Sequence, residues 1–265
     1  TGQFVLGMFK GAAVVAVYAV AIQLQAIYMG FSTAISGVFL PKVTAMVTKE
    51  NNEKAISDLF IRTGRIQYII IAFILTGFVV FGKSFIRLWA GSDYEDAYGI
   101  TLCFFIPMTV PLIQNLGIII LQARNQMKFR STLYVVIAFV SLVISIPLSK
   151  QYGGIGCAIS IALALTTGQI IVMNIYYHRV IHIDILDFWK EIGKMSLVPF
   201  AIGSLSFYLF CIYEIHTVQI FIVCIFAFSC IYVPLFWFFG MNAYEKELFV
   251  SPVRRFVGRL QKNLQ

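Results

Sequence analysis

The chain has 265 residues, of which 60% are hydrophobic and 12% are charged, and its mean hydropathy is +0.86. This composition excludes an ordinary water-soluble domain and is typical of an integral membrane protein. The formal net charge of +8 needs no nucleic acid as its explanation, because contact with anionic lipid headgroups accounts for it.

Long apolar stretches dominate the chain from its beginning to its end. Seven of them contain no Asp, Glu, Lys or Arg, and each is long enough for a helix to cross a hydrocarbon layer of roughly 30 Å. In chain order they are residues 11–41, 66–82, 97–123, 131–149, 151–178, 195–213 and 215–244. Strands of a membrane barrel would be about 10 residues long and would alternate polar with apolar residues, which these stretches do not. The sequence predicts an all-α integral membrane protein, a bundle of about seven transmembrane helices.

The positive charges are divided unevenly between the two sets of connections. If the chain enters from the outside, the outer segments hold only Lys10, Lys83, Arg87 and Lys150, and every other Lys and Arg lies on the inner side. An excess of Lys and Arg marks the cytoplasmic side of a membrane protein. We expect the N-terminal end of this chain outside, the C-terminal end in the cytoplasm, and the lipid bilayer as its surroundings.

The stretch GFVVFGKS at residues 77–84 fits the phosphate-loop pattern G-x-x-x-x-G-K-[ST]. That loop requires free backbone N–H groups between a strand and a helix. Here Gly77 and the four residues after it belong to an apolar span, where the N–H groups bond within the helix. Gly82, Lys83 and Ser84 mark the expected outer end of that helix, and we expect no ATP binding.

Three polar segments have apolar residues at helical spacing, namely 56–63, 183–194 and 251–264. We expect the first two to be short helices on the inner membrane surface. In the third, Ser251 can cap a helix and Pro252 can open it. The residues that follow separate an apolar stripe from Arg254, Arg255, Arg259 and Lys262. This pattern predicts a basic amphipathic helix on the cytoplasmic surface, with a calmodulin-like partner as the alternative.

Uncharged polar residues inside the spans are the candidates for an internal site. They either form hydrogen bonds between helices or line a polar cavity, and both interpretations stay open. The candidate cavity-lining residues are Gln23, Gln25, Gln114, Asn115 and Gln169. Pro107 and Pro111 lie four residues apart in the span 97–123 and are expected to bend it, as in transporters with broken helices beside the substrate path.

No constellation of catalytic or metal-binding groups is found. The five Cys lie inside apolar runs without metal-ligand spacing, and the three His lie in connections. The acidic cluster Asp93, Glu95 and Asp96 lacks the full spacing of a calcium loop. The sequence predicts no enzyme activity, no cofactor, no metal site and no nucleic-acid partner.

Four blocks of sequence resemble one known family of membrane proteins. They are QFVLGMFKGAAVVAVYAVAIQL (3–24), FLPKVTAM (39–46), FIRLWAGSDYEDAY (85–98) and IPLSKQYGGIGCAIS (146–160). Their order and spacing are similar to the second half of bacterial polysaccharide flippases, the O-antigen and capsule repeat-unit exporters of the multidrug/oligosaccharidyl-lipid/polysaccharide superfamily. One departure is Gly2, because the family often has an acidic residue at that place.

The resemblance implies a MATE-like transporter with about 12 to 14 helices in two lobes, of which this chain would supply the second. Residues 1–10 would end a truncated transmembrane helix, and 11–178 would form the C-terminal lobe with five helices. A cytoplasmic amphipathic connection at 179–194 would lead to two additional helices at 195–244, followed by the basic cytoplasmic tail 245–265. The missing N-terminal half of the same transporter would be the principal partner.

The implied function is transport without chemistry. A flippase of this family carries an oligosaccharide linked to polyprenyl diphosphate across the bacterial inner membrane by alternating access, for polysaccharide biosynthesis. Lys42, Arg124 and Lys128 lie at expected inner helix ends and are the candidate contacts for the diphosphate, unless they serve only as the positive-inside signal.

Three alternatives remain open at this point. A multidrug or cation antiporter of the same superfamily would share the fold, although no carboxylate lies inside the seven spans. A seven-helix receptor fits the helix count but not the end of the span 97–123, which reads LQARNQMK. A membrane subunit without transport activity is the third alternative.

Overall fold

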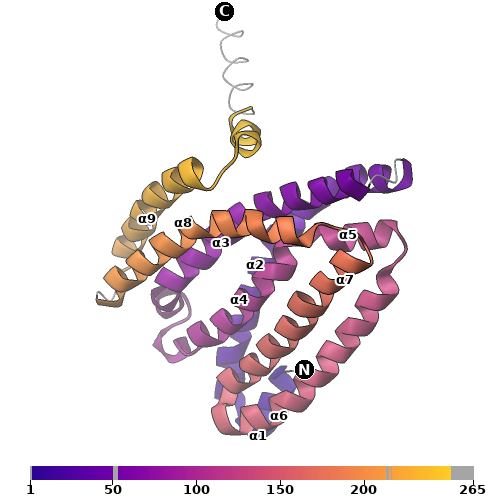
Figure 1. The fold of residues 1–265 in the computed structure, drawn as a ribbon. Helices are drawn as coiled ribbons and strands as arrows, with labels where there is room; N and C mark the ends of the chain where they lie inside the picture. The colour runs from indigo at the N-terminus through magenta and orange to yellow at the C-terminus, as the bar shows by residue number, and fades with distance from the viewer. Residues whose placement is uncertain (1, 50–52, 213–214, 216, 252–265) are drawn as a thin grey trace, which may run out of the picture.

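The computed structural model describes residues 2–49, 53–212, 215 and 217–251, and in these ranges every regular element is a helix (Figure 1). The chain begins with α1 (Gly2–Phe9), α2 (Ala12–Lys49) and α3 (Glu53–Trp89). After the short helix η1 (Ser92–Tyr94) come α4 (Ala97–Ile113), α5 (Leu116–Ala123) and α6 (Met127–Leu165). The chain continues through the π-helix η2 (Thr166–Val172), α7 (Met173–Arg179), α8 (Ile185–Ile212) and α9 (Val218–Phe239). Residues 243–251 form a last helical segment.

The described helices are consistent with a multi-pass membrane protein. Five helical stretches are long and apolar enough to span a bilayer, and a sixth is obtained if the bent pair α4 and α5 counts as one span. Large apolar side chains cover the outside, and Phe200, Phe226 and Phe239 are each more than 70% exposed. An apolar surface of this extent belongs in lipid rather than in water. The prediction of an all-α membrane protein is confirmed, and the count of seven helices stays a prediction.

The longest of these stretches reverses direction. Met127–Arg179 covers 53 residues, which as one straight helix would be about 80 Å long. At Gly153 the backbone leaves the helical region with φ 61° and ψ −136°, which a residue with a side chain rarely adopts. The Phe129 ring stacks on the Tyr176 ring at 4.0 Å between centroids, so the two arms form an antiparallel hairpin, visible in Figure 1 as α6 beside α7. If each arm crosses the bilayer, the count rises to seven.

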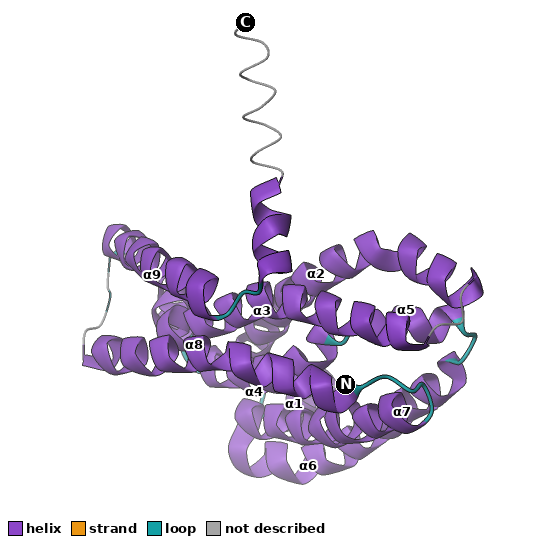
Figure 2. Cartoon of the chain, turned by 45° about the horizontal axis from the view of Figure 1, so that its top comes forward, coloured by secondary structure: helices purple, strands orange, loops and turns teal. Residues whose placement is uncertain are grey.

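Two apolar clusters hold the helices together. The larger one takes residues from α1 to α7 and from the beginning of α8. The smaller one joins α3, α8 and α9 through residues such as Phe81, Met195 and Phe228. In Figures 1 and 2, α9 lies beside α8 on the side of the molecule away from α6 and α7. Because α3 contributes to both clusters, it connects the α8–α9 pair to the main bundle.

The helix containing residues 77–84 bears out one prediction and corrects another. This stretch is helical throughout, so the backbone cradle of a phosphate loop does not form there. Gly82 does not end the helix, however, because α3 continues to Trp89. A side chain at Gly82 would meet the rings of Phe78 and Tyr98 at 3.0 Å, and close packing is the reason for a glycine here.

The loop after α3 is held by charge pairs. Arg87 and Lys83 both pair with the carboxylate of Glu95. The hydrogen bond from Arg87 and the two positive charges hold the pKa of the Glu95 carboxyl below its ordinary value. Glu95 of this acidic cluster thus has a structural role in fixing the loop to the end of α3.

Two predicted surface helices are instead the ends of longer helices. Residues 56–63 belong to α3, and Ile56, Phe60 and Thr63 are buried in the bundle. Residues 185–194 are the first turns of α8, which continues to Ile212 without a break. The polar residues of these segments had suggested separate elements, but packing against neighbouring helices keeps them in line with the apolar parts. The predicted tail helix lies outside the described residues from position 252 onward.

Candidate functional site

The strongest departure from regular helix inside the bundle is the break between α4 and α5. The two helices meet at an angle of 48°. In a continuous helix the Gly117 N–H would bond to the Ile113 carbonyl, but it donates to Gln114 at 2.9 Å instead. Asn115 N–H approaches the Leu112 carbonyl at 3.4 Å, also one residue short of the α-helical pattern. The carbonyl groups of Leu112 and Ile113 therefore need hydrogen-bond donors from elsewhere.

Side chains from α2 and α3 supply those partners. The Ser32 hydroxyl donates to the Leu112 carbonyl at 2.7 Å. With its amide nitrogen facing the break, Gln67 donates to the carbonyls of Leu112 at 3.1 Å and Ile113 at 2.9 Å, while its oxygen accepts from Ser36. All three of these side chains are buried. The break is thus a built feature with its own polar support, and we name Ser32, Ser36, Gln67, Gln114 and Asn115 the break cluster.

The other side of the break contacts α7 and α8 through one amide. Gln114 Nε2 donates to Asn174 Oδ1 at 2.8 Å, and the Trp189 indole donates to the same oxygen at 3.1 Å. Asn174 Nδ2 in turn donates to the carbonyl of Ile170 at 2.5 Å. Ile170 belongs to η2, so a second non-α segment lies beside the break. The α4–α5 break, the continuous η2–α7 segment and the beginning of α8 therefore meet through uncharged polar groups.

Gln169 is a buried polar residue on η2 that lacks this support. It is only 2% exposed, and its Nε2 has no hydrogen-bond partner among the described residues. Buried amide nitrogens are rarely left without a partner, and single turns of π-helix occur often at functional sites. The combination marks η2 as a segment with a role beyond packing.

The sequence-predicted polar residues divide into two groups. Gln114 and Asn115 lie at the break itself, and Gln169 lies on η2, which contacts α4. Gln23 is exposed and Gln25 is half-buried on α2, two turns before Ser32, and neither joins the break cluster. The bend does not lie where it was predicted. Pro107 and Pro111 lie within α4, and the helix bends after them, at residues 114–115. A proline disturbs the turn that precedes it, so the break depends on the side chains that hold the freed carbonyls.

The three predicted diphosphate contacts, Arg124, Lys128 and Lys42, lie on three different helices or helix ends. The Arg124 guanidinium donates to the carbonyl of Ile181 at 3.1 Å and so holds the loop between α7 and α8. Lys128 is exposed at the beginning of α6. Lys42 lies within α2, and its side chain is outside the described part of the structure.

A second buried polar group, which the sequence analysis missed, lies at the beginning of the apolar part of α3. Arg65 is 5% exposed and binds Glu245 through two hydrogen bonds, Nε to Oε1 at 2.6 Å and Nη2 to Oε2 at 3.0 Å. Its Nη1 also contacts Glu191 at 2.7 Å. Glu245 accepts from the Asn242 N–H at 2.9 Å, and the Asn242 side chain accepts from the Glu245 N–H, which forms a capping box. The helical segment 243–251 is thereby fixed to α3 and α8.

Gln67 and Arg65 escaped notice for the same reason. Both stand at the boundary of an apolar stretch, where polar residues are expected to face the membrane surface. Helical spacing offered a signal for Gln67 alone, because Gln67 lies four residues from the buried Thr63 and Ile71, whereas Arg65 lies two residues from Gln67 and so on the opposite side of α3. Comparison of the chain with protein-family models, with curated proteins and with solved structures finds no match.

Proposed function

We propose that this chain is one lobe of a membrane transporter that moves a lipid-linked oligosaccharide repeat unit across a bacterial inner membrane. The observation that carries the transporter class is the break between α4 and α5, whose freed carbonyl groups are bonded by Ser32 and Gln67. Broken helices held by side chains are typical of transporters, in which they border the substrate path. The cargo class rests on the resemblance of the four sequence blocks to polysaccharide flippases.

The break is the proposed moving element. Its hydrogen bonds run between side chains and carbonyls of different helices, so they can be exchanged without unfolding a continuous helix. Uncharged groups suit this role, because separating them in a membrane costs less than separating charges. Alternating access would change the angle between α4 and α5 while α2 and α3 keep their positions.

A crosslinking experiment tests this element. Ser32 and Asn115 face each other, with 3.4 Å between Ser32 Oγ and Asn115 Nδ2. In the full-length gene product with native cysteines replaced, a short thiol crosslinker between Ser32→Cys and Asn115→Cys should abolish polysaccharide export. The matched control is the pair Phe129→Cys and Tyr176→Cys in the α6–α7 hairpin, whose crosslinking should leave export intact. Export that survives the first crosslink would contradict the proposed movement.

The diphosphate of the cargo requires cations near the cytoplasmic end of the path. Arg124 and Lys128 are proposed for this role because they lie at the facing ends of α5 and α6, and Lys42 because it follows the apolar span of α2. Replacing all three with Gln should reduce export, whereas Gln at the exposed residues Lys54, Arg179 and Lys190 removes the same charge and should not. Unchanged export with normal membrane insertion would leave the three residues with the positive-inside role alone.

A further inference from the structure

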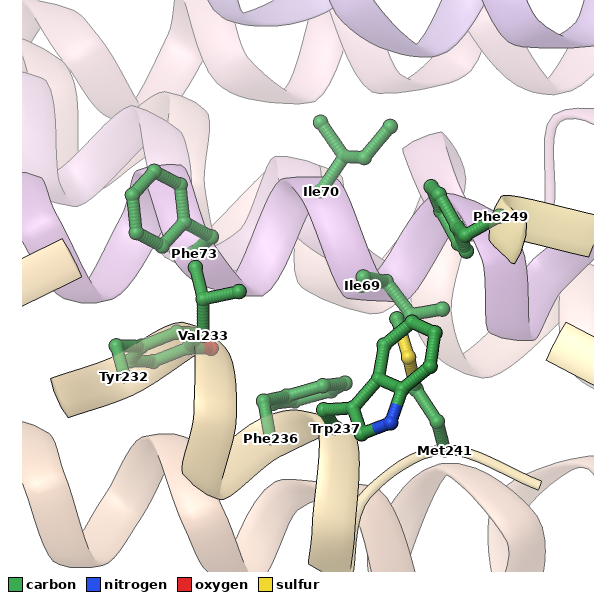
Figure 3. Close-up of a pocket in the computed structure, with 9 residues that line it drawn as sticks. All are labelled: Ile69, Ile70, Phe73, Tyr232, Val233, Phe236, Trp237, Met241 and Phe249. Atoms are coloured by element: carbon green, nitrogen blue, oxygen red, sulfur yellow. The ribbon is translucent and has the colours of Figure 1, made fainter. Parts of the chain in front are cut away.

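A pocket of about 270 Å³ lies between α3, α9 and the helical segment 243–251, apart from the break cluster (Figure 3). Its walls are apolar or aromatic, with Phe73 and Tyr232 at one end and Met241 and Phe249 at the other. Ile69, Val233 and Trp237 lie between these ends. Val233 is 55% exposed, so the pocket opens on the apolar outer surface of the bundle.

The depth of this pocket follows from helix geometry. Ile69 and Phe73 stand four and eight residues after the buried ion pair of Arg65, which places the pocket about 6–12 Å along α3 from that charged layer. In a hydrocarbon layer of roughly 30 Å, a depth of about 6–12 Å extends from the upper part of one leaflet towards the bilayer midplane. Acyl chains are the molecules that occupy this depth against an exposed apolar surface.

A cationic group stands where a lipid headgroup would be. Arg62 is exposed, seven residues and so about 10 Å before Ile69 on α3. Its guanidinium lies 5.2 Å from the centre of the Tyr244 ring, on the same segment that supplies Phe249 to the pocket. Arg62 pairs with no carboxylate among the described residues, in contrast to Arg65, which is saturated by Glu191 and Glu245. The site therefore offers a positive charge at headgroup depth above an apolar pocket.

We propose that this pocket holds an acyl chain of an anionic phospholipid from the surrounding bilayer, with the headgroup phosphate at Arg62. The inference does not depend on the proposed transport function, since it concerns a lipid of the membrane and not the cargo. The bound lipid fills the space between α9 and the segment 243–251 and so supports the contact between them. One Arg near an anionic membrane surface favours anionic over zwitterionic lipid about fivefold.

Trp237 in the pocket wall provides the readout. The full chain is placed in nanodiscs with phosphatidylglycerol or phosphatidylcholine brominated in the upper part of the acyl chain, and its fluorescence is compared with that of Trp237→Phe. The difference between the two proteins reports quenching at Trp237 alone. We expect this quenching to saturate at a low mole fraction of brominated lipid. The mole fraction that gives half of the quenching should be about fivefold lower for phosphatidylglycerol than for phosphatidylcholine. The Arg62→Gln protein should lose this preference, and the Arg179→Gln protein should keep it.

Filling the pocket gives the second test. Val233→Phe should remove the saturable quenching, while Val223→Phe, the same change at a 65% exposed position of α9, should not. Mass spectrometry of lipid retained by the purified protein should show one phosphatidylglycerol in wild type and none in Val233→Phe. Quenching that rises linearly and equally in both variants would mean bulk lipid only. The absence of quenching at any mole fraction, as expected if a protein segment fills the pocket, would also overturn the proposal. Displacement of the brominated lipid by polyprenyl phosphate at equal mole fraction would overturn it as well.

Discussion

At the scale of single residues, Gln67 replaces hydrogen bonds that the backbone of α4 loses. Its amide reaches the carbonyls of Leu112 and Ile113 from a neighbouring helix, inside the bundle where water does not compete. An amide suits this place because it both donates to the carbonyls and accepts from Ser36. A side chain of the same size without polar atoms would leave the Ile113 carbonyl unbonded, while Ser32 would still donate to the Leu112 carbonyl.

We expect Gln67→Leu to lower the free energy of unfolding by about 1–3 kcal/mol, the cost of leaving buried acceptors unsatisfied. Thermal unfolding in detergent measures the effect. Gln122→Leu is the matched control, because Gln122 is exposed on α5 and the same change should leave stability nearly unaltered. Equal effects at the two positions would show that the amide of Gln67 does not support the break.

The ion pair of Arg65 leads to a second prediction. Glu245→Gln leaves a buried guanidinium without its bidentate partner, and breaking a buried pair in this way costs about 3 kcal/mol. We expect a lower unfolding temperature and faster proteolysis within 243–251. Glu247→Gln, two residues later at an exposed position, should change neither. A variant at 245 that resembles the variant at 247 would rule out the anchoring role.

Whether the sequence predicts a buried polar residue depends on where that residue lies in an apolar stretch. Gln114 and Asn115 are isolated polar residues in the middle of such a stretch, and the sequence therefore predicts them as candidates for an internal site. Arg65 and Gln67 stand at a boundary, where charge and polarity are ordinary. The burial of Arg65 follows from tertiary packing of α3 against α8 and the segment 243–251, and the burial of Gln67 follows from packing of α3 against α2 and the α4–α5 break.

At the scale of elements, the hairpin of α6 and α7 depends on one backbone conformation. Gly153 has φ 61° and ψ −136°, and no atom lies within 4 Å of the place where a Cβ would stand. The need for glycine is therefore conformational and not steric. The adjacent Gly154 differs, because a Cβ there would meet Ile100 at 2.9 Å.

Gly153→Ala should destabilise the protein by about 1–3 kcal/mol through backbone strain at the turn. Gly193→Ala, within α8 and also without neighbours near its Cβ position, should be neutral or stabilising by up to about 1 kcal/mol. Thermal unfolding of both variants in one detergent gives the comparison. A harmless change at 153 would mean that the turn tolerates another conformation.

The sequence predicted the elements better in their centres than at their ends. Apolar stretches locate the helices, but α3 and α8 extend beyond them, because polar turns continue a helix when one side is buried. The break at 114–115 was expected near Pro107 and Pro111. The π-helix η2 was not predicted from the sequence, although its stretch of Thr, Gly, Ile and Val contains few strong helix formers.

At the scale of the whole molecule, the charge distribution gives a definite expectation for the topology in the membrane. If the two arms of the hairpin, residues 127–152 and 154–179, each cross the bilayer, residue 151 lies outside and residue 126 lies in the cytoplasm. With the native cysteines replaced, Gln151→Cys should react with an impermeant maleimide on intact cells. Gln126→Cys should react only after permeabilisation. Reaction of both, or of neither, on intact cells would exclude two crossings between residues 127 and 179.

The proposed cargo is tested most directly by measuring its transport in cells. The full gene product containing this chain is expressed in a bacterial strain that lacks its own repeat-unit flippase and accumulates lipid-linked oligosaccharide at the inner leaflet. We predict that accumulation falls, that surface polysaccharide returns, and that crosslinking positions 32 and 115 reverses both effects. Unchanged accumulation, with the protein correctly inserted and a compatible repeat unit present, would contradict the proposed function.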